Sequence, residues 1–314
     1  MKEQLKTKIE QLKADVKIEK AMQILEETHE AIVDLQMQLC AIRSPSNMEE
    51  NRAKHFYELM SQIGLDHVYM DEVNNVIGLW KGTGDGPTLV VAAHMDTVFK
   101  FPAKEFYYDR EANVVWSPDG GGADDRAGVF AILYILKSHF RPSIIFTTDE
   151  EKGCIGAEAF TTDIPMALTE TKYIVQLDRR GKDDCVFYDC YNQEFEKYVN
   201  HFGFKTAIGS FSDISIICPF WKIAGVNLSV GYFNEHSTAE YLNVGYLFNT
   251  ITKVIRMLND AENEYQEGVQ KLENSKITYQ NGLRDYENGQ KELADAKAEL
   301  DAEKRYIVHF PQDN

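Results

Sequence analysis

The chain has 314 residues, of which 44% are hydrophobic and 26% are charged, a composition typical of folded globular proteins and unlike collagen-like or disordered chains. Fifty acidic residues against 33 basic ones give a formal net charge of −17. Such a chain repels phosphate backbones and anionic lipid surfaces, so we expect no nucleic-acid binding. The length is sufficient for a large core in one or two domains.

The sequence also argues against membrane-spanning segments, a secretion signal and disulfide bonds. It has no run of about 18 apolar residues, and its first 20 residues lack the apolar core of a secretion signal. We therefore expect no membrane insertion and a cytoplasmic location. The cysteines are odd in number and form no CxxC pair, so we expect them to be reduced and mostly buried. They are Cys40, Cys154, Cys185, Cys190 and Cys218.

In chain order, residues 1–45 carry apolar side chains at helical spacing and predict one long helix or two shorter ones. Residues 51–63 predict a further helix, which Gly64 ends. Short apolar segments then predict strands over residues 73–80, 88–93, 143–147, 173–177 and 225–231. Helical patterns follow some of these strands, over residues 127–140 and 239–258.

The alternation of buried-type strands with helices indicates βαβ units. We expect an α/β fold with three αβα layers and a mostly parallel central sheet, covering residues 1–260 and including the N-terminal helices of residues 1–45. Ligands of open α/β sheets bind beyond the carboxyl ends of the strands. Polar residues that follow the predicted strands are therefore the candidates for function.

From about Asp260 the sequence becomes polar, and large side chains recur every seven residues. They are Tyr265, Leu272, Tyr279, Tyr286, Leu293 and Leu300, and a small residue follows most of them three positions later. This pattern predicts a coiled-coil-like helical arm over residues 261–304, with a tail over 305–314. The arm would pair with another helix, either in a homo-oligomer, in another partner or at the N-terminus. A solvated, partly frayed tail is the alternative, because each glycine disfavours a helix by about 1 kcal/mol.

Five short segments carry acidic or imidazole groups after predicted strands. In the first, His94 and Asp96 lie two residues apart in an extended segment, so Asp96 can hold the imidazole in the tautomer that a metal needs. A structural histidine is the alternative. In the second, a glycine-rich turn presents Asp124 and Asp125 at a helix start. An ordinary helix cap is possible there, whereas a phosphate loop lacks its Gly-Lys-Ser/Thr ending.

The third segment places Asp149, Glu150 and Glu151 side by side, where like charges repel unless a cation or solvent relieves them. The fourth ends a strand with Asp178, and the fifth presents His236 in a polar loop. Two histidines and several carboxylates, without cysteine, suit two divalent metal ions of the zinc type.

These motifs, in this order and together with Leu39-Cys-Ala-Ile-Arg-Ser-Pro-Ser46, resemble the co-catalytic dinuclear zinc exopeptidases. That clan holds aminopeptidases, tripeptidase T-like and carboxypeptidase G-like enzymes, and the resemblance runs from about residue 25 to residue 258. It implies the following metal ligands: His94 and Asp178 for one ion, Glu151 and His236 for the other, and Asp124 as the bridge. It further implies Glu150 as general base, Asp96 as the partner of His94, and a cis peptide after Asp124.

The resemblance implies a metal-dependent exopeptidase that cleaves short peptides with a water held between two ions, zinc first and cobalt or manganese as alternatives. Only 57 residues separate Asp178 from His236, too few for the lid domain of the carboxypeptidase branch, so we expect that lid to be absent. An aminopeptidase fits best. A carboxypeptidase or dipeptidase, an N-acyl-amino-acid amidohydrolase, and a non-catalytic protein acting through its arm stay open. Arg179 or Arg180 would receive a substrate carboxylate or simply neutralise neighbouring acids.

Overall fold

The structure is a computed structural model that describes residues 45–46, 48–80, 88–138, 140, 142–162, 165, 168–188, 190 and 193–307. The predicted N-terminal helices therefore lie almost wholly outside the described residues, as does Cys40. The other four cysteines are buried and form no disulfide bond with one another, as predicted. Contacts along the backbone divide the chain into two compact units, Met1–Asn259 and Asp260–Asn314.

The first unit is built on an eight-stranded mixed sheet. Its strands, in spatial order, are β1 (His67–Met70), β2 (Val76–Leu79), β6 (Ser143–Thr147), β3 (Thr88–His94), β7 (Thr171–Arg179), β10 (Ala224–Ser229), β8 (Asp184–Val186) and β9 (Lys205–Thr206). The four central strands β6, β3, β7 and β10 run parallel. The five predicted strands correspond to β2, β3, β6, β7 and β10, and the predicted fold class is confirmed.

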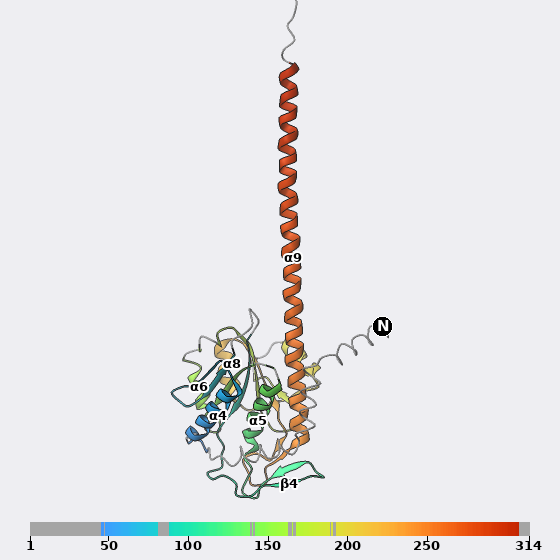
Figure 1. Cartoon of the computed structure of the whole chain (residues 1–314). Helices are drawn as coiled ribbons and strands as arrows, with labels where there is room; N and C mark the ends of the chain where they lie inside the picture. Colours follow the sequence, from blue (N-terminus) through green and yellow to red (C-terminus); the bar gives the residue numbers. More distant parts are fainter. Residues whose placement is uncertain are drawn as a thin grey trace, which may run out of the picture. The chain divides into compact units, whose positions relative to one another are not determined.

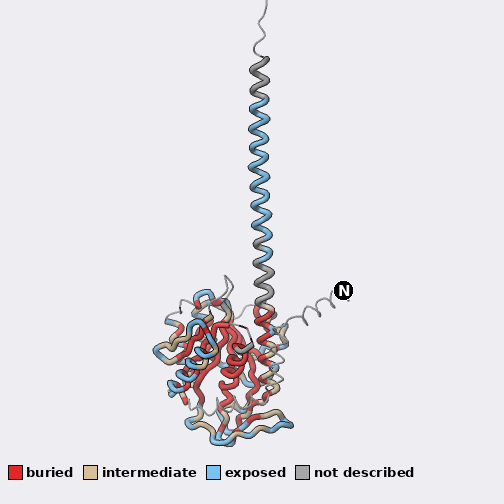
Figure 2. The backbone as a smooth tube through the Cα atoms, in the orientation of Figure 1, coloured by how far each residue is buried: buried red, intermediate tan, exposed pale blue. Residues whose placement is uncertain are grey.

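Helices cover both faces of this sheet (Figure 1). They are α4 (Glu50–Ile63), α5 (Ala123–Ser138), α7 (Gln193–His201) and the start of α9 (Val244–Ile307) on one face, and α6 (Ile155–Ala159) and α8 (Asp213–Trp221) on the other. Because successive side chains of a strand point to opposite faces, Val91 packs in the first layer and Val90 in the second. Figure 2 shows the strands as the buried centre of this unit. Burial on both faces explains why the central strands are continuous apolar runs.

A second, smaller sheet contains four short strands. Its spatial order is β11 (Tyr232–Phe233), β12 (Tyr241–Asn243), β5 (Val114–Trp116) and β4 (Tyr107–Asp109). Segments of two or three residues carry too little alternation to be recognised, so the sequence did not predict them. This sheet matters for function because the loop between β11 and β12 carries His236.

The interval between Asp178 and His236 holds β8, α7, β9, α8, β10 and β11 in its described residues. All of these elements belong to the two sheets or to the helices that cover them. The described part of this interval therefore forms no separate lid domain.

Helix α9 is continuous over 64 residues. The predicted helix over 239–258 is wrong at both ends, because residues 241–243 form β12 and because the helix continues to Ile307. From residue 274 to 299 every side chain is exposed. None of the helices in the described residues is long and apolar enough to cross a membrane.

Candidate metal centre

The parallel strands bring three of the predicted segments to one edge of the sheet. His94 is the last residue of β3, and Asp178 lies one residue before the end of β7. Glu150 and Glu151 follow β6 in the short 3-10 helix η1 (Glu150–Lys152). Since β6, β3 and β7 are parallel neighbours, their carboxyl ends lie together.

Two groups of ligand-type side chains meet at this edge, and both include Asp124. The first consists of His94, Asp124 and Asp178, and the second of Asp124, Glu151 and His236. Within each group the candidate ligand atoms lie within 4.8 Å of one another. The five residues that the resemblance implied as metal ligands are thus brought together.

Asp124 directs one carboxylate oxygen to each group. Its Oδ1 lies 3.0 Å from Nε2 of His94, and its Oδ2 lies 3.1 Å from Nε2 of His236. The same His236 nitrogen lies 2.8 Å from Oε2 of Glu151. One carboxylate between two imidazoles is the arrangement that a ligand shared by two cations requires.

The neighbouring Asp125 belongs to neither group. Its carboxylate accepts hydrogen bonds from the backbone N–H groups of Gly128 and His94, at 3.0 and 3.2 Å. Both acids lie at the start of α5 with non-helical backbone angles, and the peptide bond between them is cis, as the resemblance implied. Asp124 is therefore the acid that reaches the two groups.

Asp96 links the histidine to the acidic turn. Its Oδ1 lies 3.1 Å from Nδ1 of His94 and accepts the N–H of Glu150 at 3.0 Å. Its Oδ2 accepts the Ser46 hydroxyl at 2.7 Å and the N–H of Glu151 at 3.2 Å. Burial alone would raise the pKa of Asp96, but these hydrogen bonds hold it below its usual value. Because Asp96 occupies Nδ1 of His94, the other ring nitrogen, Nε2, faces Asp124. The same carboxylate fixes the backbone of Glu150 and Glu151.

Glu150 is buried and belongs to neither group of three. Burial, followed by the charges of Asp178 and Asp213, raises its pKa to about 10. A carboxyl group with so perturbed a pKa, beside a cluster of ligand-type residues, is typical of a catalytic acid or base.

The donor set fits divalent cations of the zinc type. Imidazole nitrogens and carboxylate oxygens are ligands that such ions accept. Oε1 of Glu151 is buried and has no hydrogen-bond partner. Burial alone would lower the pKa of His94, yet the surrounding carboxylates, led by Asp178, hold it well above its usual range. Hydrogen bonds to Asp124 and Glu151 raise the pKa of His236 to about 11. These carboxylates therefore strongly favour positive charge between them.

The two arginines have partners that belong to neither group. Arg179 donates from Nη2 to the carbonyl oxygen of Ile208 at 3.3 Å and lies 3.8 Å from Asp184. Arg180 forms an exposed ion pair of 2.7 Å with Glu235. Substrate recognition by either arginine stays a prediction.

Sequence reasoning missed the residues that support Asp178. Its Oδ2 accepts hydrogen bonds from Ser212 at 2.9 Å and from Gln176 at 3.1 Å, and its Oδ1 accepts the hydroxyl of Tyr232 at 3.2 Å. Asp213, fully buried, binds the Thr147 hydroxyl. Ser212 also caps α8 in a capping box, so in sequence this pair is indistinguishable from an ordinary helix start.

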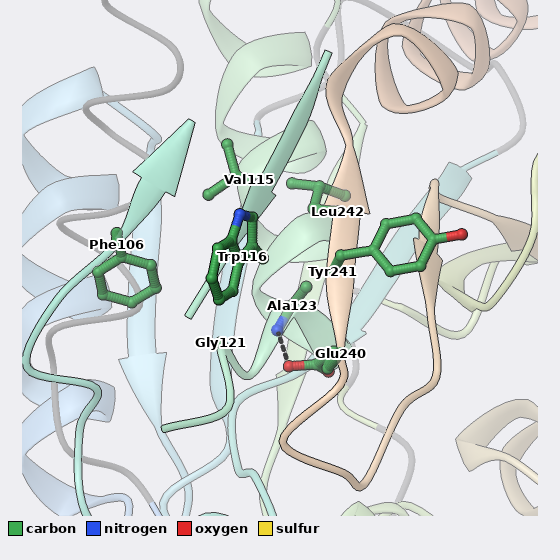
Figure 3. A pocket seen from close by; sticks show the side chains of 8 residues that line it. All are labelled: Phe106, Val115, Trp116, Gly121, Ala123, Glu240, Tyr241 and Leu242. Atoms are coloured by element: carbon green, nitrogen blue, oxygen red, sulfur yellow. Dashed lines mark hydrogen bonds between the residues drawn. The ribbon is translucent and has the colours of Figure 1, made fainter. Parts of the chain in front are cut away.

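Glu240 was missed as well. Figure 3 shows its carboxylate turned toward Ala123 in a small apolar pocket. Oε2 accepts the N–H of Ala123 at 3.0 Å, and Oε1 accepts the N–H of Asp124 at 3.1 Å. Burial, followed by the charge of Asp124, raises the pKa of Glu240 to about 7. Glu240 therefore holds the backbone that carries Asp124, although in sequence it is one acid among many.

Comparisons with known proteins agree with this site. Residues 75–212 match peptidase family M28, a range that contains every residue of the two groups except His236. A Pyrococcus abyssi protein named as a LysW-lysine/LysW-ornithine hydrolase is 32% identical over 130 residues, which are 41% of this chain and 35% of that protein. Carboxypeptidase G2 from a Pseudomonas species is 34% identical over 93 residues, 27% of this chain and 22% of that protein. The chain thus spans about a third or less of these curated relatives.

Among solved structures, aminopeptidase PepT from Bacillus cereus shares the fold. The TM-score is 0.63 at 16% identity, with 74% of this chain and 99% of that chain covered. The family match over residues 75–212, the sequence relatives and the shared fold confirm the predicted resemblance to the co-catalytic zinc exopeptidases.

Proposed function

We propose that the protein is a metal-dependent exopeptidase of short peptides, and specifically an aminopeptidase that uses two zinc ions, or cobalt or manganese in their place. The observation that carries the proposal is the pair of three-residue groups that share Asp124 beside the buried Glu150. Unpaired buried charges destabilise the folded state. A non-catalytic protein would therefore have no reason to keep so many acidic residues in one buried site. A cytoplasmic location stays a prediction from the sequence.

In this proposal, His94 and Asp178 would hold one cation, Glu151 and His236 would hold the other, and Asp124 would serve both. When bound, the cations would polarise the substrate carbonyl, acidify water and lower the pKa values of the surrounding carboxyl groups. Asp96 keeps Nε2 of His94 directed to the centre. Glu150 accepts the proton of the attacking water and returns it to the leaving amine.

A second candidate is hydrolysis of an amide at the other end of the substrate, as a carboxypeptidase, a dipeptidase or an N-acyl-amino-acid amidohydrolase. The names of the sequence relatives favour it, since carboxypeptidase G2 and the LysW-lysine hydrolase are both more than 30% identical in the matched part. The short interval between Asp178 and His236, whose described residues form no separate lid, favours the aminopeptidase, because it brings the architecture closer to the single-domain branch.

The test is mass spectrometry of a defined mixture of short peptides, some blocked at the amino end and some at the carboxyl end, after incubation with zinc- or cobalt-loaded protein. We expect residues to be lost from free amino ends only. The control is Glu150→Gln, which should reduce turnover about 10²- to 10⁴-fold, the usual contribution of a general base.

The outcomes separate the candidates. Loss from the carboxyl end, or cleavage of acyl-amino acids alone, would replace the aminopeptidase by the second candidate. If every peptide and acyl-amino acid stayed intact although the metal was bound, the proposed hydrolase function would be refuted.

Metal content tests the proposed ligands separately from turnover. Glu150→Gln should keep the full complement of metal, because Glu150 lies outside both groups. Asp124→Asn should lose affinity for both ions, since Asp124 is shared. Elemental analysis after dialysis against limiting zinc measures both variants, and equal metal in Asp124→Asn and wild type would contradict the shared role.

A further inference from the structure

The described part of the arm presents a continuous row of exposed large side chains. Tyr279, Tyr286 and Leu293 recur every seven residues in α9 and are 71%, 62% and 73% exposed. Leu283, at the flank of the row, is 47% exposed. A helix whose apolar row faces water is typical of one strand of a coiled coil.

Small residues complete this row. Gly282 and Gly289 follow Tyr279 and Tyr286 by three positions, and a Cβ atom added to either would meet no atom within 4 Å. Glycine disfavours a helix, and no packing within the described residues explains it here. Its absent side chain allows a second helix to approach closely between the tyrosines. We call the large residues of this row and the small residues between them, over residues 265–300, the seam of the arm. Along the seam, Tyr or Leu alternates with Gly, Ser or Ala at spacings of three and four residues.

The charges beside the seam select the partner and its direction. One flank carries four acids and one lysine, namely Glu264, Lys271, Asp285, Glu292 and Glu299, and the other flank carries Lys276, Lys297 and Lys304. In a parallel, in-register pair, each residue of the first flank faces the residue five positions later in the other helix. Glu292 then meets Lys297 and Glu299 meets Lys304, two attractive pairs against the one repulsive pair of Lys271 and Lys276. An antiparallel pair would place each flank against its own copy, so the flank of Lys276, Lys297 and Lys304, which carries no acid, would face itself.

We propose that the seam of residues 265–300 is a dimerisation surface, and that its occupant is the same arm of a second copy of this chain, parallel and in register. The sustained seven-residue repeat predicts a left-handed supercoil. The proposal rests on the arm alone and is independent of the proposed hydrolase activity.

The first test is the mass of the full-length protein in solution, by light scattering coupled to size exclusion across a range of concentrations. We expect twice the chain mass for the wild type. Tyr279→Glu, Tyr286→Glu and Leu293→Glu in one chain should weaken self-association at least about 100-fold, because the seam would bury unpaired carboxylates. The matched control adds the same three charges away from the seam, as Gln280→Glu, Asn288→Glu and Ala294→Glu, and should remain dimeric.

Three results would overturn the proposal. A wild type that is monomeric at every concentration would mean that the seam binds another segment of the chain or another protein, and not a second copy. A seam variant that stays dimeric would place the interface elsewhere. A control that dissociates together with the seam variant would show that added charge, and not the seam, is responsible.

Cross-linking tests the direction of the pair. In a chain with Cys40 replaced by Ser, Tyr279→Cys and Leu293→Cys are made separately and oxidised. In a parallel dimer each position meets its own copy, so both variants should form covalent dimers, while Asn288→Cys, away from the seam, should not. An antiparallel dimer has one centre and cannot cross-link both positions, which are about 21 Å apart along the helix.

Discussion

Asp124 and Asp96 illustrate how single residues combine several tasks in this protein. Asp124 offers one oxygen to each histidine, while Asp96 holds His94, Ser46 and the backbone of the acidic turn. Replacing either changes more than one contact. For this reason, variants here are most informative where the replaced group has a single, separable role.

Glu240 offers such a case, in the protein freed of metal by a chelator. A carboxyl group whose pKa rises on folding, here from 4.5 to about 7, favours the folded state below pH 4.5, and this stabilisation is lost as the pH rises through 7. At 1.36 kcal/mol per unit, the loss is at most about 3 kcal/mol. Glu240→Gln should therefore flatten the decline of unfolding free energy between pH 5 and pH 8, measured with urea. Parallel curves for the variant and the wild type would contradict the assignment.

At the residue scale, the sequence predicted those site residues that directly follow a strand. His94, Asp178 and the acidic turn follow apolar runs, so their meeting at one edge was expected. Glu240, Gln176 and Ser212 could not be found in this way. They act through hydrogen bonds to the backbone or to another side chain, and those partners become neighbours only after folding.

At the level of elements, the fit of α5 against β7 depends on one glycine. A Cβ atom on Gly128 would lie 1.7 Å from the carbonyl oxygen of Leu177 and about 2.5 Å from the Asp125 carboxylate. Gly128→Ala should therefore lower the unfolding free energy by about 3 kcal/mol, a large effect for overpacking.

The control for this variant is Gly282→Ala, also in a helix, where the added methyl group meets nothing within 4 Å. It should leave the unfolding free energy of the first unit unchanged, and only this unit is compared because Gly282 lies in the proposed seam of the arm. Urea unfolding followed by circular dichroism compares the two. If both variants changed the unfolding free energy of the first unit equally, the contact of the added methyl group at position 128 would have to be relieved by movement of α5.

The elements found from sequence are those with long periodic patterns. The central strands and α4 were predicted within a few residues. β4, β5, β11 and β12 were missed because strands of two or three residues pair through tertiary contacts. The break between β12 and α9 was missed for the same reason, since Tyr241–Asn243 reads as the first turn of a helix until β5 pairs with it.

For the whole molecule, the division at residue 260 predicts that chemistry and association separate. Every residue of the two ligand groups and Glu240 lie between positions 94 and 240. A chain ending at Asn259 should keep cation binding and hydrolyse peptides within about twofold of the wild type, as expected for distant and independent sites, while losing self-association. Steady-state kinetics beside light scattering measure both properties. A truncated chain that bound no cation would contradict the independence of the first unit.

The three tryptophans of the chain, Trp80, Trp116 and Trp221, all belong to the first unit, whereas the second unit has tyrosines but no tryptophan. Indole fluorescence therefore observes the first unit alone, while the far-ultraviolet dichroism of helices draws heavily on α9. The protein thus carries two optical reporters of different regions. Coincident melting curves would mean that both regions unfold in one cooperative step, and separated curves would reveal the order in which they are lost.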